Sequence, residues 1–214
     1  KCHKGSLAAS AAVALETSVH KLLQIYERYV DVFLAPSNFV KQKLVEFGQD
    51  EKKIVVLPHG VEISADQGGT SASHQTVPYF LYVGRLHPTK GVDVALSALA
   101  RLADTRVRLK IAGEGISQAF LEKKAQEFGV TERVDWFGHQ TKAQVRSLML
   151  GARAVIMPSV YYETFSLVTA EAFALGKLVV ASNLGALPEL VCDKETGLLF
   201  PTGNAHALSE HLTW

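Results

Sequence analysis

Five short apolar runs, separated by stretches with helical spacing, are the feature that most limits how this chain can fold. A run that is apolar on both faces is typical of a parallel strand covered by helices on two sides. The runs cover residues 80–83, 107–112, 134–137, 154–157 and 178–181, and the helical stretches lie near 91–103, 117–128, 141–150 and 165–175. The alternation therefore predicts a doubly wound α/β domain with a parallel sheet.

The residues before this domain follow a shorter α/β pattern. The spacing of Leu15, Val19 and Leu22 predicts a long amphipathic helix, and Ser37 offers an N-cap for a second one. In chain order, the expected elements are a helix over 6–29, a strand over 32–35, a helix from the turn at 36–38 to about 47, and a strand over 54–57. This pattern predicts a partial α/β segment in front of the larger domain.

A stretch rich in small and polar residues separates the two patterns. Residues 64–76 have the composition of a flexible surface connection. We therefore predict that residues 1–63 are part of one domain, that residues 64–76 are a linker, and that residues 77–214 form a second domain. The chain begins at Lys1, and Trp214 falls within a helical pattern that has no stop signal, so we expect an excerpt that is cut at both ends.

Charge and composition exclude several classes of function. The net charge is +1 and no basic stripe is interleaved with aromatic residues, so no nucleic-acid partner is expected. No apolar stretch approaches the roughly 20 residues of a membrane-spanning helix, and no secretory signal pattern is present. Cys2 and Cys192 are the only cysteines, which fits a reducing compartment. These features predict a cytoplasmic location.

The loops after the expected strands carry unusual side chains. Arg85 and Lys90 lie five positions apart on a loop flanked by Gly84 and Gly91, and two such cations can clamp a diphosphate. On this loop alone, two solvated cations beside turn glycines are the simpler interpretation. Gly113, after the second strand, permits close approach of a ligand, although such turns commonly just reverse the chain. Ligands of open α/β sheets bind outside the carboxyl ends of the strands, so these loops are where chemistry is expected.

Two carboxylates accompany the fourth strand. Glu171 lies within the apolar run 167–175, where an ionised group is costly to bury unless hydrogen-bond donors meet it. Vicinal hydroxyls of a ligand are such donors, and a buried ion pair is the alternative. Glu163 precedes it by eight positions, and its alternative is a simple loop carboxylate. If the helix starts near Phe165, its free N–H groups point toward the crevice of Arg85 and Lys90 and favour an anion there.

These residues belong to a series of short motifs whose order and spacing carry a resemblance. The motifs are Val83-Gly84-Arg85, Lys90-Gly91, Ala112-Gly113-Glu114-Gly115, Phe137-Gly138, Pro158-Ser159, Glu163-Thr164-Phe165-Ser166, Glu171 to Gly176, Ser182, Gly185, Pro188-Glu189 and Gly197 to Phe200. Together they resemble the retaining glycosyltransferases of family 4, which have the GT-B fold. Residues 77–212 are similar to the Rossmann-like C-terminal domain of that fold. Residues 35–39 and 57–61 resemble the end of its N-terminal, acceptor-side domain and the crossing between the domains.

The resemblance implies a role for each matching residue. Arg85 and Lys90 would hold the nucleotide diphosphate, Glu163 would lie by the donor sugar, and Glu171 would bind the ribose hydroxyls. The expected catalytic groups are Glu163, Arg85 and Lys90, and the expected donor-binding residues are Gly84, Gly113, Gln140, Thr164, Phe165, Ser166, Leu167 and Glu171, with the nucleobase near Gly138, His139 and Gln140. The family usually has Gly where this chain has Ser166, which narrows the approach to the sugar.

The implied activity is transfer of a hexose-type sugar with retention of anomeric configuration, as in polysaccharide biosynthesis. The donor would be UDP-, GDP- or ADP-linked, and the acceptor a glycan, a lipid or a small molecule. Neither a cofactor nor a metal is expected, and the chain contains no Asp-x-Asp pair.

Two other functions remain open from the sequence. One is a module that only binds a nucleotide-sugar, because we expect most of the acceptor-binding domain to be missing; we also expect the isolated fragment to be inactive. The other is a GT-B epimerase or phosphorylase, which suits the fold but not the paired glutamates. Lys41, Lys43, Lys52 and Lys53 are most simply a solvated face; the alternative is a peripheral membrane contact through a lipid acceptor.

Overall fold

The computed structural model describes residues 6–61 and 77–213. The chain divides into two compact units, Lys1–Pro58 and His59–Trp214. The connection predicted over residues 64–76 lies outside the described residues. Within the two described ranges, no helix is long and apolar enough to cross a membrane.

The first unit is a small α/β segment. Its two parallel strands pair with Phe33 opposite Ile54 and Ala35 opposite Val56. Its elements are α1 (Leu7–Leu23), α2 (Ile25–Tyr29), β1 (Phe33–Ala35), α3 (Asn38–Glu46) and β2 (Ile54–Val56). The strands and α3 confirm the prediction for this region, including Ser37 as the N-cap, whose side chain accepts a hydrogen bond from the amide of Val40.

The single helix predicted over residues 6–29 is wrong. Gln24 adopts a left-handed conformation with φ of 51°, and its amide bonds to the carbonyls of His20 and Lys21, which ends α1. A second short helix, α2, starts at the next residue. Apolar spacing does not reveal this break, because both helices keep the same periodicity.

Three of the four lysines that the sequence suggested as a solvated face have partners within this unit. Lys53 donates to the carbonyl oxygens of Glu27 (2.7 Å) and Val30 (2.9 Å) near the end of α2. The ammonium of Lys41 lies 3.1 Å from Oε1 of Glu51, and the ammonium of Lys43 lies 2.6 Å from Oε2 of Glu46. Lys53 therefore has a structural role, since cations near a helix C-terminus stabilise the free carbonyl groups there.

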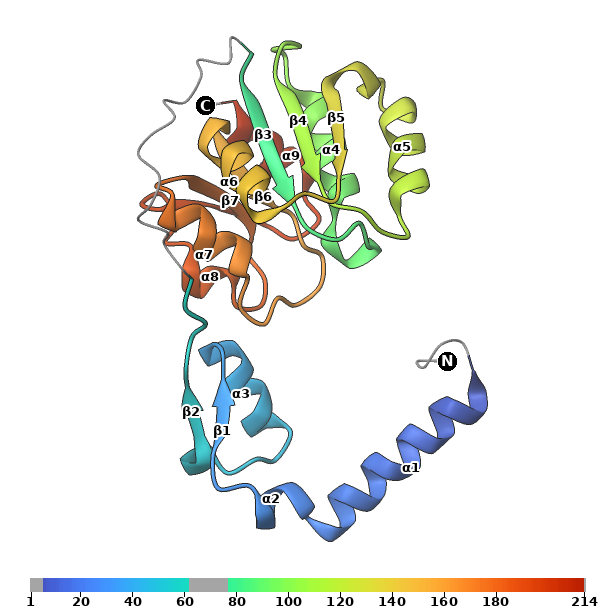
Figure 1. Ribbon diagram of the computed structural model, residues 1–214, viewed down its shortest axis with the longest axis vertical. Coiled ribbons are helices and arrows are strands. Elements are labelled where there is room, and N and C mark those ends of the chain that lie inside the picture. The colour runs from blue at the N-terminus through green and yellow to red at the C-terminus, as the bar shows by residue number, and fades with distance from the viewer. Residues whose placement is uncertain (1–5, 62–76, 214) are drawn as a thin grey trace. The chain divides into compact units, whose positions relative to one another are not determined.

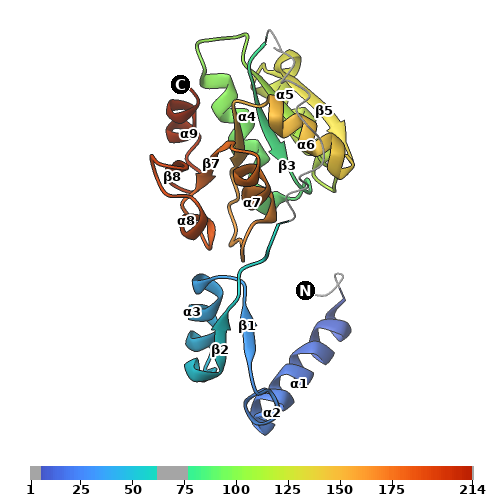
Figure 2. The same cartoon turned by 60° about the vertical axis from the view of Figure 1, so that its left-hand side comes forward.

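The second unit contains a six-stranded sheet in the order β5-β4-β3-β6-β7-β8, in which all strands are parallel (Figures 1 and 2). The strands are β3 (Tyr79–Val83), β4 (Arg108–Ala112), β5 (Val134–Gly138), β6 (Ala154–Met157), β7 (Leu178–Ser182) and β8 (Gly197–Phe200). The five predicted strands and the doubly wound α/β fold are confirmed. The sequence predicted β8 only as a motif; its four residues begin with Gly197, a residue type that is depleted in strands.

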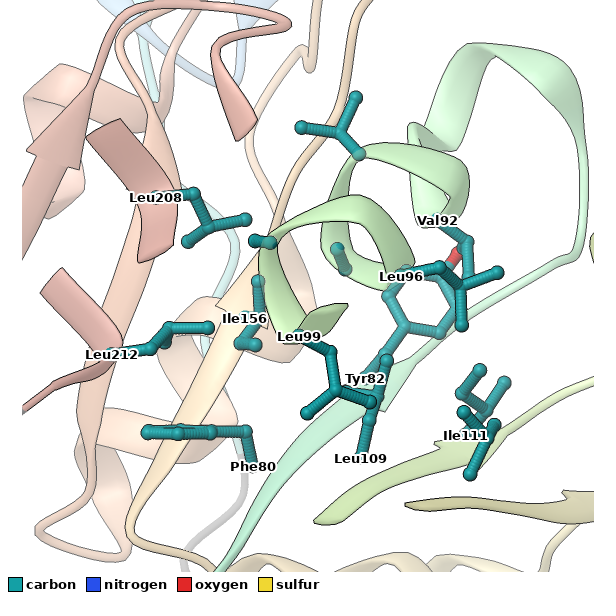
Figure 3. Close-up of a cluster of buried hydrophobic side chains, with 14 of the residues drawn as sticks. Phe80, Tyr82, Val92, Leu96, Leu99, Leu109, Ile111, Ile156, Leu208 and Leu212 are labelled. Carbon is teal, nitrogen blue, oxygen red and sulfur yellow. The ribbon is translucent and has the colours of Figure 1, made fainter. Parts of the chain in front are cut away.

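Helices cover both faces of this sheet. They are α4 (Val92–Arg101), α5 (Gln118–Glu127), α6 (Lys142–Gly151), α7 (Leu167–Ala174), α8 (Leu187–Leu190) and α9 (Ala205–Leu212). Helices α4, α5 and α9 share one buried cluster with the sheet, which includes Phe80, Leu96 and Leu208 (Figure 3). Helices α6, α7 and α8 share the other, which includes Leu81 and Met149. Burying one such side chain contributes about 1.5–3 kcal/mol, so these two clusters hold the sheet between its layers.

The order of the strands reverses between β3 and β6. From β3 the chain builds outward through β4 and β5, then returns to the other side of β3 with β6, where Phe80 lies opposite Ala154. Loops on the two sides of such a reversal diverge, which leaves a crevice at the carboxyl ends of the strands. The segments after β3 and β6 therefore lie side by side, although they are far apart in the sequence.

Helix α7 begins at Leu167, two residues later than the sequence predicted. Ser166 is the N-cap, and its hydroxyl oxygen accepts from the amide of Thr169 (3.3 Å) and lies 2.8 Å from the hydroxyl of Thr169. Ser166 has φ of 94° and ψ of 86°, a region that favours glycine. This residue therefore combines a favourable cap with a strained backbone.

We predict that Ser166→Gly stabilises the second unit, whereas Ser166→Ala destabilises it. Glycine removes backbone strain of about 1–3 kcal/mol and loses only a few tenths of a kcal/mol as a cap. The greater conformational entropy that glycine gives the unfolded chain lowers the stability by about 0.5–1 kcal/mol. Alanine keeps the strain and loses a cap contribution of about 1 kcal/mol. Thermal unfolding should show shifts of about 2–4 °C per kcal/mol in opposite directions. A fall in Tm for both variants would contradict the claim that the backbone of Ser166 is strained.

Candidate active site

A cavity of about 300 Å³ opens where β3 and β6 end. It is lined by His59, Tyr82, Val83, Gly84, Arg85, Lys90, Met157, Glu163, Thr164, Phe165, Ser166, Leu167 and Val168. Eight of the residues that the sequence predicted for the site are thus brought together: Gly84, Arg85, Lys90, Glu163, Thr164, Phe165, Ser166 and Leu167. They come from the segments after β3 and β6 and from the start of α7, which is the crevice that the strand order creates.

Tyr82 fixes the start of the loop after β3. Its phenol is buried and donates to the carbonyl oxygen of Arg85 at 2.8 Å. Burial raises the pKa of Tyr82 above its ordinary value, the carboxylate of Glu163 raises it further, and the guanidinium of Arg85 lowers it. The phenol therefore stays protonated and keeps this donor role at neutral pH. Arg85 itself is exposed at the cavity.

Gly113 allows the loop after β4 to pass close behind Gly84. Gly113 has φ of 149°, and a side-chain carbon on it would lie 1.9 Å from the carbonyl oxygen of Gly84. The amide of Gly84 donates to the carbonyl of Ala112 at 3.0 Å. Gly113 does not line the cavity, so its contribution is to support the loop of Arg85 from behind.

Glu163 and Lys90 form an ion pair across the cavity. The ammonium of Lys90 lies 2.7 Å from Oε1 of Glu163, and the hydroxyl of Ser159 donates to the same oxygen at 2.5 Å. Both charged side chains are largely withdrawn from solvent, with exposed fractions of 24% for Lys90 and 14% for Glu163. The interpretation of Glu163 as a simple loop carboxylate is therefore wrong.

The backbone of Glu163 is held by the loop after β7. Its carbonyl oxygen accepts from the amide of Ala186 at 2.9 Å, and a side-chain carbon on Gly185 would lie 2.7 Å from that oxygen. The two loops of the cavity are also joined directly, because the amide of Val160 donates to the carbonyl of Thr89 at 3.0 Å. Glu163 is thus fixed by both its main chain and its side chain.

Glu171 and Gln140 do not line the cavity. Glu171 is half-buried on α7, one turn beyond Leu167 and Val168, so it lies on the face of the helix that borders the cavity. Within residues 6–61 and 77–213 it has no ion-pair partner, so the alternative of a buried ion pair is not observed there. Gln140 instead bonds to its own loop, donating to the carbonyls of Phe137 (2.7 Å) and His139 (3.0 Å).

Three other residues of this site make contacts that the sequence did not predict. Ser159 is 1% exposed and orients Glu163, Tyr82 anchors Arg85, and His59 lies edge-to-face against Phe165 with ring centroids 5.3 Å apart. Ser159 lies two positions after the end of β6 and belongs to one of the sequence motifs, and the rule that strand ends carry chemistry points to it. Nothing in the local sequence of Tyr82 distinguishes it from an ordinary core tyrosine.

The cavity is built to receive an anion that also carries hydroxyl groups. Arg85 can donate through its fork and Lys90 as a point charge, and the first amides of α7 add the partial positive charge of a helix N-terminus. Glu163 can accept from a hydroxyl. Among the residues that the structure describes, no group of three or more His, Cys, Asp and Glu side chains is placed to hold a metal ion.

A second cavity, of about 350 Å³, lies at the opposite edge of the sheet. Its lining includes Arg153, Leu178 and Gly197 near the amino ends of β6, β7 and β8, together with Lys194 and His211. It contains none of the predicted site residues. Ligands of open α/β sheets bind at the carboxyl ends of the strands, so the cavity with Arg85 and Glu163 is the candidate active site.

Comparisons with known proteins identify the family. Residues 68–214 match the family described as Glycosyl transferases group 1. The chain is 34% identical over 188 residues to a glycogen synthase of Mycobacterium tuberculosis, which covers 86% of this chain and 45% of that protein. It is 35% identical over 169 residues to a D-inositol 3-phosphate glycosyltransferase of Segniliparus rotundus, covering 72% of this chain and 37% of that protein. The chain thus spans less than half the length of these relatives.

Solved structures agree on the fold. HepE of Anabaena, solved in complex with UDP-glucose, superimposes with a TM-score of 0.81 at 22% identity, over 91% of this chain and 56% of that one. Sucrose-phosphate synthase of Thermosynechococcus elongatus gives a TM-score of 0.78 at 26% identity, over 89% of this chain and 51% of that one. With the family match covering most of the sequence, the chain belongs to the Glycosyl transferases group 1.

Proposed function

We propose that the chain carries the donor site of a retaining, metal-independent glycosyltransferase of family 4 that takes a hexose-type sugar from a nucleotide-sugar. The observation that carries this proposal is the cavity that joins Arg85, Lys90, Glu163 and the start of α7. Few ligand classes need two cations and a helix N-terminus on one side and a carboxylate acceptor beside them. A sugar linked to a nucleoside diphosphate is one that does.

Each residue has a stated role in this proposal. Arg85 and Lys90 bind the diphosphate, and Glu163 accepts a hydrogen bond from a hydroxyl of the donor sugar. The amides of Leu167 and Val168 at the start of α7 meet phosphate oxygens. Glu171, one turn further along α7, binds the ribose hydroxyls, much as an acidic residue does in dinucleotide-binding folds.

The proposed reaction relies on electrostatics in place of a metal. As the bond between the sugar and the diphosphate breaks, negative charge grows on the leaving phosphate and positive charge on the sugar ring. Arg85 and Lys90 stabilise the first, which is the largest contribution that these residues can make. The acceptor oxygen bonds to the anomeric carbon on the face that the diphosphate leaves, and its proton passes to the leaving phosphate oxygen, so the configuration is retained. Glu163 positions the sugar in this scheme.

The names of the relatives support this class of reaction. They include a glycogen synthase and D-inositol 3-phosphate glycosyltransferases, and HepE, which has the same fold, was solved with UDP-glucose. UDP-glucose is therefore the first donor to test. We propose that residues 1–63 are the end of an acceptor-side domain, with a glycan, lipid or small molecule as acceptor.

A binding module without transfer activity is the second candidate for this isolated chain. It is favoured by one observation, namely that the chain spans 45% of the glycogen synthase and 37% of the inositol phosphate glycosyltransferase that it matches. Product analysis of the full-length protein distinguishes a glycosyltransferase from an epimerase, which needs no acceptor, and from a phosphorylase, which needs inorganic phosphate.

Removing Arg85 or Glu171 should weaken nucleotide binding. A hydrogen bond to a charged group contributes about 1.5–3 kcal/mol, so Arg85→Ala and Glu171→Ala should each raise the Kd of the preferred nucleotide by roughly 10- to 150-fold. Thermal-shift screening of UDP-, GDP- and ADP-glucose identifies the base, and calorimetry then measures the Kd. Arg153→Ala, in the other cavity, is the matched control and should bind as wild type. Unchanged binding by both site variants would refute the site.

Transfer should require the full-length protein. We expect the 214-residue chain to bind the nucleotide-sugar without turnover, because GT-B enzymes close two domains around their ligands. The full-length protein should transfer the sugar with the anomeric configuration of the donor, at a rate that EDTA does not change. NMR of the product anomer and a chelator titration measure both properties. An inverted product, or activity lost on chelation, would refute the corresponding part of the mechanism.

A further inference from the structure

One oxygen of Glu163 receives both of the donors that contact this carboxylate in the described part of the chain. Lys90 and Ser159 lie 2.7 Å and 2.5 Å from Oε1. No such contact is observed for Oε2 within residues 6–61 and 77–213, and Glu163 lines the cavity. Ser159 is buried and holds the carboxylate from behind. The carboxylate is therefore fixed through one oxygen, which leaves the other to accept from a ligand.

The ion pair with Glu163 also engages the ammonium group of Lys90. A partly buried ion pair at 2.7 Å is a strong, charge-assisted interaction because water screens it little. A diphosphate that recruits Lys90 must compete with Glu163 for its ammonium. Arg85 has no such competitor, because within the described residues no carboxylate lies within ion-pair distance of it. The two cations that line the cavity are thus not equally available to an anion.

We propose that Glu163 competes with the diphosphate for Lys90, and that a sugar hydroxyl bound at Oε2 relieves this competition. The inference rests on the proposed function. When Lys90 moves toward phosphate, Glu163 loses one of its two donors and keeps only Ser159. A nucleotide-sugar replaces the lost donor with its own hydroxyl, whereas a free nucleoside diphosphate brings none to this position. Glu163 thereby makes the site favour the donor over the spent nucleotide, and Ser159 is a positioning residue for it.

A double-mutant cycle tests the competition. UDP and UDP-glucose are titrated calorimetrically into the 214-residue chain and into Glu163→Gln, Lys90→Met and the double variant. We expect Glu163→Gln to bind UDP about five- to tenfold more tightly, because Lys90 is released. The same substitution in the Lys90→Met background should change the Kd of UDP by less than about twofold. The ratio of the UDP Kd to the UDP-glucose Kd should fall toward one in Glu163→Gln.

Ser159→Ala provides the matched comparison, because it removes a donor from Oε1 and leaves the ion pair. Its affinity for UDP should fall severalfold, because Glu163 keeps neither donor once Lys90 moves to the phosphate, whereas its affinity for UDP-glucose should fall less, because the sugar hydroxyl replaces the lost donor. A role in folding alone would weaken both ligands together. Ser159→Cys, which restores a weak donor, should recover part of the loss. Thermal melting of every variant checks that it is folded. If Glu163→Gln does not fold, Glu163→Ala removes the same charge and takes its place.

Two results would overturn the inference and leave the proposed function intact. The first is that UDP binding depends on Arg85, while Glu163→Gln weakens that binding or leaves it unchanged. The second is an equal gain in UDP affinity with and without Lys90, which would indicate simple repulsion between the carboxylate and the anion. A wild-type chain that binds none of the UDP-, GDP- and ADP-linked probes would refute the proposed function, and the inference with it.

Discussion

The reversal of strand order between β3 and β6 is the constraint on which the candidate site depends. Parallel strands end at the same edge of a sheet, and loops diverge only where the order of the strands reverses. Here the reversal places the segment after β3 beside the segment after β6. Arg85 and Lys90 thus meet Glu163, although Lys90 and Glu163 are 73 positions apart in the chain. Without this topology, each loop would carry isolated surface charges.

Packing makes this arrangement rigid. Buried clusters on the two faces fix the sheet, and glycines at the strand ends let neighbouring loops approach more closely than any side chain would allow. Hydrogen bonds from Tyr82, Val160 and Ala186 then hold the backbone of the two site loops. The charged groups are therefore preorganised, which is what stabilisation of a charged leaving group requires.

Much of the second unit was predictable because β3, β6 and β7 are buried on both faces over nearly their whole length. Such runs are continuous and apolar, whereas β4 and β5 contain charged residues and could be recognised by their alternation with helices. The boundaries that were missed depend on single backbone conformations. Gln24 and Ser166 both have positive φ, which ends one helix and delays the start of another, and neither residue type signals this conformation.

The residue types of the site were also predictable, but its contacts were not. Motif order identified the eight predicted residues that line the cavity, yet the ion pair between Lys90 and Glu163 depends on the three-dimensional approach of two loops. Ser159 and Tyr82 act through their hydroxyl groups on other residues of the site, and sequence spacing carries no signal of such contacts. Gln140 shows the converse, since its side chain bonds to its own loop.

The central claim is that the cavity at the carboxyl ends of β3 and β6 binds the diphosphate of a nucleotide-sugar. A crystal structure of the chain with bound UDP-glucose tests it most directly. The account predicts phosphate oxygens at hydrogen-bonding distance, about 3 Å, from Arg85 and Lys90, with the sugar beside Glu163. Ligand density in the cavity of Arg153 and Lys194, with the cavity of Arg85 empty, would contradict it.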